Sequence, residues 1–471
     1  MSLVTLFLGL LVPWLAGMSL LLALPAQRPL SERGELAWIA GTGYFVGAFL
    51  LTLWMRALSR MGIDFGGFAI GVPLLAVAVG GGYLAWRRAA NALPGTIRGA
   101  GRALLSPPGL SGVARWAWRA LLVWIALRFL LLGLEISWQP LFPWNAWSQW
   151  ATKARVWFEL GRIVPFADSA DWFAADGTAY FDAGPHLPPT LPLLQVWASI
   201  ALGRWDDALM NWPWWQFAVA LSLAVYGALR TLDMSALAAL VVTFFVSSLP
   251  LANVHVALAG YADLPLAACY AGAALAVLRW TTTRELRDAV LTLVLALAAA
   301  QIKAPGIVWA ATLVPGVIAA LWPRRGVKIA AAIMAAILFG LLVLAQTSLT
   351  LLGYPFHLAY GPAWGALAES YFLLGSWNLL WYGALAATLL AWRDLVLPPL
   401  APLTMIVFAG ATLLFALVAF PGTRVAIADQ TSVNRATLQF APVAIVFAAL
   451  AFRAFALRCA RAGTGSELAS A

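Results

Sequence analysis

The chain has 471 residues, of which 63% are hydrophobic and only 10% are charged, and its mean hydropathy is +0.86. This composition excludes a soluble globular protein, which could not bury so much apolar surface, and it predicts an integral membrane protein. The net charge of +10 is typical of nucleic-acid-binding proteins among soluble chains. Here most of the basic residues flank apolar segments, where they meet anionic headgroups, so we expect membrane lipids and no nucleic acid as partners.

Apolar segments long enough to cross about 30 Å of hydrocarbon recur along the whole chain. They predict an all-α polytopic membrane protein with about 13 transmembrane helices. The predicted spans are 3–24, 35–56, 66–86, 117–137, 210–230, 236–253, 264–280, 288–302, 305–322, 329–350, 375–392, 399–420 and 438–457. Segments 264–280 and 288–302 are short for full crossings, and 191–203 is compatible with a re-entrant or interfacial helix.

The basic residues set the orientation, because Lys and Arg accumulate in cytoplasmic loops. Most of the 29 Lys and Arg residues lie inside if the amino terminus is outside. The loop at 138–190 is then extracytoplasmic and the carboxyl terminus is cytoplasmic. A basic cytoplasmic linker separates an amino-terminal three-helix unit, 1–115, from the main membrane module, 116–460, and we expect a disordered cytoplasmic tail at 461–471.

The outer loop contains aromatic and small residues at three- and four-residue intervals, which are typical of one helical stripe. The stripe consists of Trp144, Trp147, Trp150, Ala151, Ala154, Trp157 and Phe158. One interpretation is an amphipathic interfacial helix whose Trp side chains enter the headgroup region. The other makes Asn145, with its neighbours Gln149 and Lys153, the wall of a substrate groove.

Asp263 and Lys303 both stand at predicted outer ends of helices. Asp263 occupies a position typical of an N-cap, and Pro265 suits the first helical turn that follows. Lys303 precedes a Pro-Gly break, where a lysine either snorkels to the membrane edge or binds a phosphate. Arg435 repeats this arrangement before the last span. Two cations at one membrane depth indicate an anionic lipid headgroup.

The three histidines of the chain, His186, His255 and His357, lie at or near the same outer side in this topology. The chain has no His-Glu-x-x-His helix and no fixed spacing of metal ligands. The sequence therefore requires no cofactor. A divalent metal site formed by His255, Asp263 and His357 is compatible with the sequence.

In the order and side of its motifs, the chain resembles the bacterial membrane glycosyltransferases of the GT-C superfamily, close to the family 39 type of protein mannosyltransferases and aminoarabinose transferases. The resemblance covers about 116–457. The segments that carry it are Trp144-Asn-Ala-Trp-Ser-Gln-Trp150, His186-Leu-Pro-Pro-Thr190, Gly260-Tyr-Ala-Asp263, Lys303-Ala-Pro-Gly306, Ser376-Trp-Asn-Leu-Leu-Trp381 and the Arg435 region.

Such enzymes transfer a sugar from a polyprenyl-phosphate carrier to an envelope glycan, lipid or protein at the outer face of the bacterial inner membrane. The resemblance implies a GT-C-like fold with a periplasmic active site below a large first catalytic loop that carries interfacial helices. The family's two acidic positions fall at Asn145 and Asp263, and Lys303 and Arg435 match cations that hold the donor phosphate. The other expected substrate-binding residues are His186, Tyr261, Gln149 and Lys153.

The chain departs from this family at Asn145, where members usually carry Asp and where an amide cannot accept a proton at neutral pH. Three explanations of Asn145 compete. The acceptor is already ionised and needs no base, or another loop acid such as Asp182 or Asp176 acts as the base, or the substitution inactivates the protein. The alternative functions are a catalytically impaired homologue that binds lipid-linked sugar and a polyprenyl-lipid transporter. Spans 3–24, 236–253 and 329–350 carry almost none of the polar residues that a transport path needs.

Overall fold

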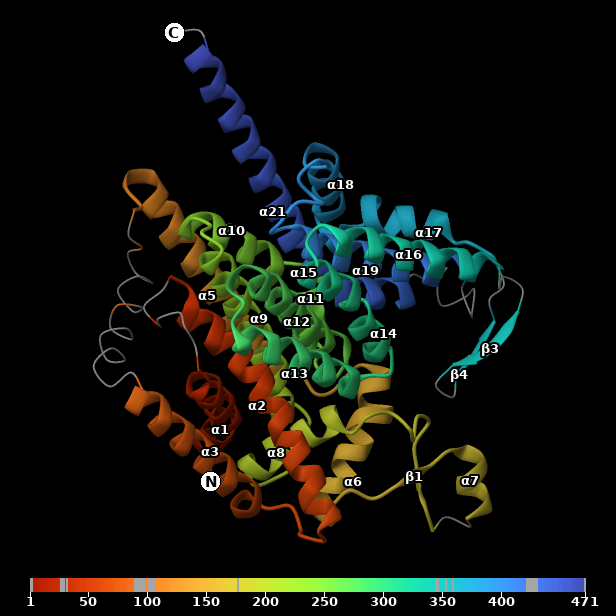
Figure 1. The fold of residues 1–471 in the computed structure, drawn as a ribbon. Coiled ribbons are helices and arrows are strands. Elements are labelled where there is room, and N and C mark those ends of the chain that lie inside the picture. The colour runs from red at the N-terminus through yellow and green to blue at the C-terminus, as the bar shows by residue number, and fades with distance from the viewer. Residues whose placement is uncertain are drawn as a thin grey trace. The chain divides into compact units, whose positions relative to one another are not determined.

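The structure is a computed structural model and describes residues 3–25, 33–88, 109–175, 178–343, 347–351, 354–357, 360–420 and 431–469, with the single residues 30, 99 and 107. Within these ranges the chain is nearly all-α (Figure 1). Eight of the described helices are long and apolar enough to cross a membrane, and a bent helix pair forms a ninth crossing if it is one span. The chain is therefore built as a multi-pass membrane protein, whereas the count of 13 spans is not confirmed.

The count differs because several predicted spans are broken or short. Span 236–253 divides into α10 (Ala236–Ser247) and α11 (Pro250–Ala257), which meet at 60°. Pro250 explains this break, since the residue before a proline is disfavoured in helical conformation. Span 305–322 divides similarly into α14 (Pro305–Ala311) and α15 (Val314–Leu321).

Two short sheets also occur in the described residues, where the sequence predicts only helices. β1 pairs in parallel with β2 in the outer loop, with Phe166 opposite Tyr180 and Ala167 opposite Phe181. β3 pairs antiparallel with β4, with Ser348 opposite His357. The second pair begins within the predicted span 329–350, whose helix ends at Val343. Thr and aromatic residues in this region favour strands.

The chain contains two compact units, of which the first comprises Met1–Ser248, Ala252–Gly272 and Glu285–Ile307. Its elements are α1 (Leu3–Ala23), α2 (Glu35–Arg60), α3 (Gly67–Arg88), α5 (Gly112–Trp138), η1 (Ala146–Ala151), α6 (Thr152–Leu160), β1 (Phe166–Ala167), α7 (Ser169–Ala174), β2 (Tyr180–Phe181), α8 (Thr190–Leu202), η2 (Leu209–Asn211), α9 (Trp212–Thr231), α10 and α13 (Leu286–Ile302). The boundary near residue 115 stays a prediction, and 89–98 and 100–106 of its linker lie outside the described residues.

The second unit comprises Leu249–Leu251, Ala273–Arg284 and Val308–Ala471. Its elements are α15, α16 (Arg325–Val343), β3 (Ser348–Leu351), β4 (Tyr354–His357), α17 (Trp364–Ala368), η3 (Glu369–Leu373), η4 (Gly375–Trp377), α18 (Leu380–Leu390), α19 (Ala401–Ala419) and α21 (Thr431–Ala469). Helices α11, α12 (Asp263–Thr283) and α14 contribute residues to both units. Helix α21 continues to Ala469, where the sequence predicts a disordered tail from residue 461; its Ala, Arg, Glu and Leu residues favour helix.

Glycines bring the backbones of α1 and α2 into direct contact. A Cβ atom on Gly17 would overlap the carbonyl oxygen of Gly43, and one on Gly47 would overlap the carbonyl oxygen of Pro13. Gly43 and Gly47 are four residues apart and lie on one face of α2. This small-residue spacing is typical of helices that associate tightly within a membrane, where close backbone approach supplies the packing energy.

Gly47→Ala is expected to destabilise the protein by about 1–3 kcal/mol, because the added methyl meets backbone that cannot move aside. Gly82→Ala in α3 is the matched control, since a Cβ there meets no atom within 4 Å. The control should be as stable as the wild type or slightly more stable, because Ala favours helix. Thermal unfolding in lipid nanodiscs measures both. Equal unfolding temperatures for Gly47→Ala and the wild type would show that the two helices are not in close contact.

Helices α2 and α13 are tied together at their amino-terminal ends. Glu35 forms an ion pair with Arg287, and both side chains are almost completely buried. One residue further on, Asp288 accepts a hydrogen bond from Nε1 of Trp38 at 3.3 Å. Figure 1 shows the two helices side by side. These contacts fix α13 to α2 before α13 reaches Lys303.

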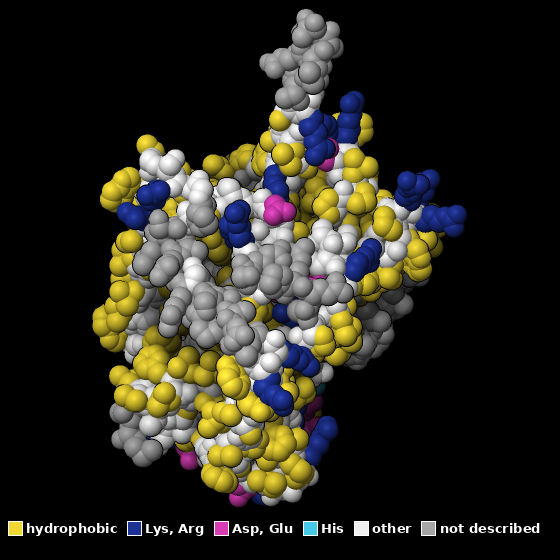
Figure 2. Space-filling model, turned by 60° about the vertical axis from the view of Figure 1, so that its left-hand side comes forward, with side chains coloured by type: hydrophobic (Ala, Val, Ile, Leu, Met, Phe, Trp, Pro, Cys, Tyr) yellow, Lys and Arg dark blue, Asp and Glu magenta, His cyan; other side chains and the backbone are white. Residues whose placement is uncertain are grey.

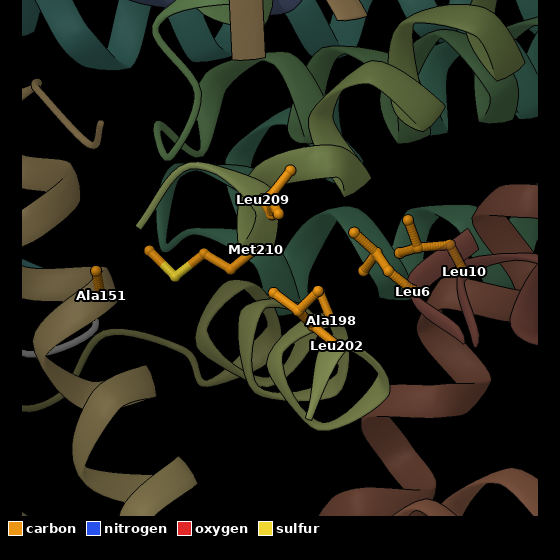
Figure 3. Close-up of a cluster of buried hydrophobic side chains, with 7 residues drawn as sticks. All are labelled: Leu6, Leu10, Ala151, Ala198, Leu202, Leu209 and Met210. Carbon is orange, nitrogen blue, oxygen red and sulfur yellow. The ribbon is translucent and has the colours of Figure 1, made fainter. Parts of the chain in front are cut away.

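The outer loop packs on the helices of the first unit. Figure 3 shows one buried cluster that contains Ala151 of η1, Ala198 and Leu202 of α8, Leu209 and Met210 of η2, and Leu6 and Leu10 of α1. The loop therefore shares a hydrophobic core with the membrane helices.

The predicted aromatic stripe is divided between this core and the surface. Trp150 and Trp157 are buried in protein, whereas Trp144 is 68% exposed. Residues 146–151 form a π-helical turn, which holds more residues than an α-helical turn and so changes the register of the stripe. The loop helix therefore differs from the predicted interfacial helix with one continuous apolar face.

Hydrophobic side chains cover much of the surface. Figure 2 shows them in broad patches on one face, with Lys and Arg scattered between them. Helices α5 and α16 bury only 17% and 11% of their most apolar segments, so most of each lies at the surface. Exposed apolar helices of this length are expected where a protein contacts lipid.

Candidate functional site

An ion pair between Asp263 and Lys303 lies at the centre of the candidate site. Nζ of Lys303 lies 2.9 Å from Oδ1 of Asp263; the carboxylate side chain is completely buried, and that of the lysine is 21% exposed. Asp263 begins α12, and Lys303 follows the last residue of α13 in extended conformation. The carboxylate therefore holds a partly accessible ammonium in place.

A close approach of two backbones places the Asn145 turn beside the residues that lead into Asp263. Gly260 has a φ of +108°, and a Cβ on it would lie 2.6 Å from Cβ of Ala146 and 2.9 Å from Cδ1 of Leu141. Only glycine fits both this conformation and this contact. The two acidic positions of the resemblance, Asn145 and Asp263, therefore lie on chain segments that touch each other.

Asn145 and Gln149 present two amides on the π-helical turn. Asn145 immediately precedes the turn and Gln149 lies within it, and both side chains are half-buried. Neither amide forms a hydrogen bond with another described residue. Each amide offers a donor and an acceptor, which suits the hydroxyl groups of a sugar. π-helical turns occur frequently at functional sites.

Lys153 and Asp182 close the outer loop from inside. Nζ of Lys153 donates to the carbonyl oxygen of Gly184 at 2.6 Å and lies 3.3 Å from Oδ1 of Asp182. That same oxygen accepts the backbone N–H of Gly184 at 2.5 Å. Burial lowers the pKa of Lys153, and the charge of Asp182 and its hydrogen bond offset part of this effect. The structure thus brings two predicted site residues together, in the interior of the loop.

Asp182→Asn is expected to destabilise the loop by about 3–5 kcal/mol at pH 7, because it leaves the Lys153 ammonium buried without a counter-charge. The loss should shrink as the pH rises, since the variant lowers the pKa of Lys153 further and deprotonation removes the unpaired charge. Limited proteolysis of the loop measures its opening. Asp171→Asn, an exposed acid of the same loop, is the control and should be cleaved at the wild-type rate. Equal cleavage of both variants would contradict a closing role for the pair.

Arg56, near the end of α2, joins three helices just before Lys303. Its Nη1 donates to Oε1 of Gln301, and its Nη2 donates to Oγ1 of Thr190, both at 2.6 Å. The Thr190 hydroxyl in turn donates to the carbonyl oxygen of Gln301 at 2.5 Å. This arrangement ties the ends of α2 and α13 to the start of α8.

The sequence does not reveal these contacts, although two signals point toward them. Arg56 and Arg60 lie on the predicted outer side, against the tendency of basic residues to lie inside. Thr190 ends the His-Leu-Pro-Pro-Thr segment that carries part of the resemblance. Gln301, which binds both Arg56 and Thr190, shows no such signal in the sequence and lies 245 residues after Arg56.

The outer loop is also bonded to the chain that follows α2. The backbone N–H of Phe65 donates to the carbonyl oxygen of Gly161 at 2.5 Å. The backbone N–H of Ile163 donates to Oγ of Ser59 at 3.1 Å. The loop, Arg56 and Lys303 therefore meet at one end of the first unit.

Other predicted site residues lie around the Asp263 turn or elsewhere in the chain. The carbonyl oxygen of Tyr261 accepts a hydrogen bond from the indole N–H of Trp214 at 2.7 Å. The ring centroid of Tyr261 lies 5.1 Å from the ring centroid of the buried His255. His186 is exposed in the segment before α8. Asp176 lies outside the described residues, as does the side chain of His357.

Arg435 belongs to the second unit, where its neighbours on α21 form polar contacts. Asn434 accepts a hydrogen bond from Oγ of Ser370 at 2.5 Å, and the hydroxyls of Thr437 and Tyr371 lie 2.8 Å apart. Burial raises the pKa of Tyr371 to about 12, and the bond to Thr437 offsets part of the shift. The phenol therefore stays protonated at physiological pH. Arg435 itself is half-buried.

The described side chains contain no group of three His, Cys, Asp or Glu residues that could hold a metal ion. The first unit offers instead a lysine fixed by a carboxylate, an arginine fixed by neutral acceptors, and two amides. Cations of this kind bind phosphate oxygens, and amides bind hydroxyls. No family model, curated protein or solved structure matches the chain.

Proposed function

We propose that the chain is an integral-membrane glycosyltransferase, which transfers a sugar from a polyprenyl-phosphate carrier to an extracytoplasmic envelope glycan, lipid or protein. One observation carries the proposal. The buried carboxylate of Asp263 holds the partly exposed ammonium of Lys303, and the segment that leads into Asp263 contacts the Asn145 turn. A charged phosphate group and a hydroxyl-rich sugar are the ligands that such neighbours suit.

In the proposed reaction the acceptor oxygen attacks the anomeric carbon of the sugar. A new carbon–oxygen bond forms while the bond between that carbon and the phosphate oxygen breaks. The polyprenyl phosphate leaves with the electron pair, and Lys303 stabilises the negative charge that develops on it. Asp263 acts as a positioning residue, because its buried carboxylate orients the ammonium. Arg435 belongs to the second unit, and its expected role in binding the donor phosphate stays a prediction.

Asn145 decides how the acceptor loses its proton. Its amide can orient a sugar or acceptor hydroxyl, but it cannot take up a proton at neutral pH. An acceptor that is already ionised needs no base, and its reaction would tolerate Asn145. Asp182 is fully buried against Lys153, so it offers no exposed carboxylate for this role. Asp176, the other candidate base, lies outside the described residues, so an ionised acceptor and Asp176 both stay as explanations.

The proposed location is a bacterial inner membrane with the site on the periplasmic face. The eight long apolar helices support a membrane location. The distribution of Lys and Arg supports the orientation, because the basic loops would face the cytoplasm.

The direct test is release of labelled polyprenyl phosphate from a panel of polyprenyl-phosphate sugars by the purified protein in lipid nanodiscs, with membrane extract as acceptor. Release that depends on Asp263 would establish the transfer. Saturable binding without release would identify a homologue that binds lipid-linked sugar without turnover. Asn145→Asp adds a further arm: faster release would indicate a missing base, and an unchanged rate would fit an ionised acceptor.

A further inference from the structure

The charge of Arg56 is fixed in place but is not neutralised. Its terminal nitrogens bind the neutral oxygens of Gln301 and Thr190. No carboxylate pairs with it among the residues that the structure describes. A half-buried charge without a counter-charge is costly, and arginine stays protonated at any physiological pH. A bound anion would supply the missing charge.

The guanidinium also keeps N–H donors that its present bonds do not use. Arginine has more donors than the two bonds to Gln301 and Thr190 occupy. The bond to Gln301 lies on the exposed side of the group, so a free donor of Nη1 can reach an incoming molecule. The buried Nε has no acceptor within the described part of the chain. A planar group with free donors matches phosphate oxygens well.

A second arginine raises the positive potential at the same end of α2. Arg60 lies one helical turn after Arg56, is exposed, and has no ion pair with a described residue. Like charges four residues apart on a helix repel each other. An anion beside Arg56 would relieve this repulsion.

We propose that Arg56 binds a phosphate group of the substrate, as a second cation of the site that contains Lys303. Gln301 holds Arg56 and lies two residues before Lys303, so one short segment joins the two cations. Lys303 is paired with Asp263, whereas Arg56 has no carboxylate of its own among the described residues. The source of the phosphate, the polyprenyl-phosphate donor or a phosphorylated acceptor, rests on the proposed function; the binding of phosphate does not.

Titration calorimetry of the full-length protein in nanodiscs of neutral lipid tests the binding, with inorganic phosphate and pyrophosphate as probes. Arg56→Gln should weaken pyrophosphate binding by about tenfold or more, and Arg56→Lys should lose less because it keeps the charge. Arg162→Gln removes an exposed arginine of the outer loop and changes the net charge equally. This control should bind pyrophosphate as the wild type does. Pyrophosphate binding that is absent, or that is the same in Arg56→Gln, would overturn the proposal.

Gln301→Glu separates phosphate binding from a purely structural role of Arg56. The new carboxylate still accepts the hydrogen bond from Nη1 and neutralises the guanidinium, so the fold should be at least as stable. If Arg56 binds phosphate, this variant loses pyrophosphate affinity to a similar extent as Arg56→Gln. If Arg56 only ties the helices together, the variant binds like Arg162→Gln, and the proposal is wrong.

Turnover assays then identify the source of the phosphate. A defect of Arg56→Gln that persists with unphosphorylated acceptors assigns the phosphate to the polyprenyl-phosphate donor, and one confined to phosphorylated acceptors assigns it to the acceptor. Pyrophosphate binding that depends on Arg56, without any sugar transfer, would support the inference and overturn the proposed function. Sugar transfer together with pyrophosphate binding that does not depend on Arg56 would support the proposed function and overturn the inference about Arg56.

Discussion

Lys303→Met is expected to slow the release of polyprenyl phosphate by about 100- to 1000-fold, the effect of removing one preorganised group that stabilises charge in a transition state. The lysine is the partly exposed member of its pair, so its ammonium is accessible to the phosphate that leaves in the proposed reaction. Methionine keeps the apolar stem of the side chain and removes the charge. Single-turnover release of labelled donor in nanodiscs measures the change.

Two further variants make this result specific. Lys303→Met leaves Asp263 buried without its cation, so the double variant Asp263→Asn, Lys303→Met should recover stability and stay equally slow. Lys328→Met removes an exposed lysine from the second unit and should keep the wild-type rate. A rate for the double variant close to that of the wild type would refute the role of Lys303, because the fold would be intact and the charge absent.

Glu35→Gln is expected to lower the free energy of unfolding by about 3–5 kcal/mol. The substitution leaves the guanidinium of Arg287 buried without its carboxylate, and Nε of Arg287 already has no acceptor among the described residues. Thermal and denaturant unfolding in a mild detergent measure the loss.

The double variant Glu35→Leu, Arg287→Met removes both charges and should recover most of this stability, since apolar pairs replace buried ion pairs at little cost. Glu159→Gln is the control at the surface. Glu159 pairs with Arg155 four residues earlier, and both side chains are at least half exposed, so its loss should cost about 1 kcal/mol or less. Equal effects of Glu35→Gln and Glu159→Gln would contradict the burial of the inner pair.

The sequence predicted the helical regions well because membrane helices satisfy their own backbone hydrogen bonds and show a strong apolar signal. Each predicted span contains helix. Where one apolar run became two helices, as at Pro250 and at Thr312, the composition on both sides of the break is similar. Hydropathy therefore cannot locate such a bend, and the number of spans is the least accurate part of the prediction.

The site was predictable in part. Asp263 and Lys303 were selected separately, from a helix start and a Pro-Gly break, and the structure joins them directly. The partners of Arg56 were not predictable, because Gln301 and Thr190 are ordinary polar residues whose contact depends on how three helices end. The closing role of Lys153 was not predictable either, because its position on the loop helix was equally compatible with lining a groove and with being buried.

Helices α2 and α13 are fastened to each other at both ends, by Glu35 and Arg287 at one end and by Arg56 and Gln301 at the other. Two helices that are fixed to each other at both ends resist sliding past one another, so α13 holds Lys303 at a constant position along α2. Any opening of the site must come from the opposite wall. There two hydrogen bonds join the outer loop to α2 and the residues that follow it: the N–H of Phe65 donates to the carbonyl oxygen of Gly161, and the N–H of Ile163 donates to Oγ of Ser59.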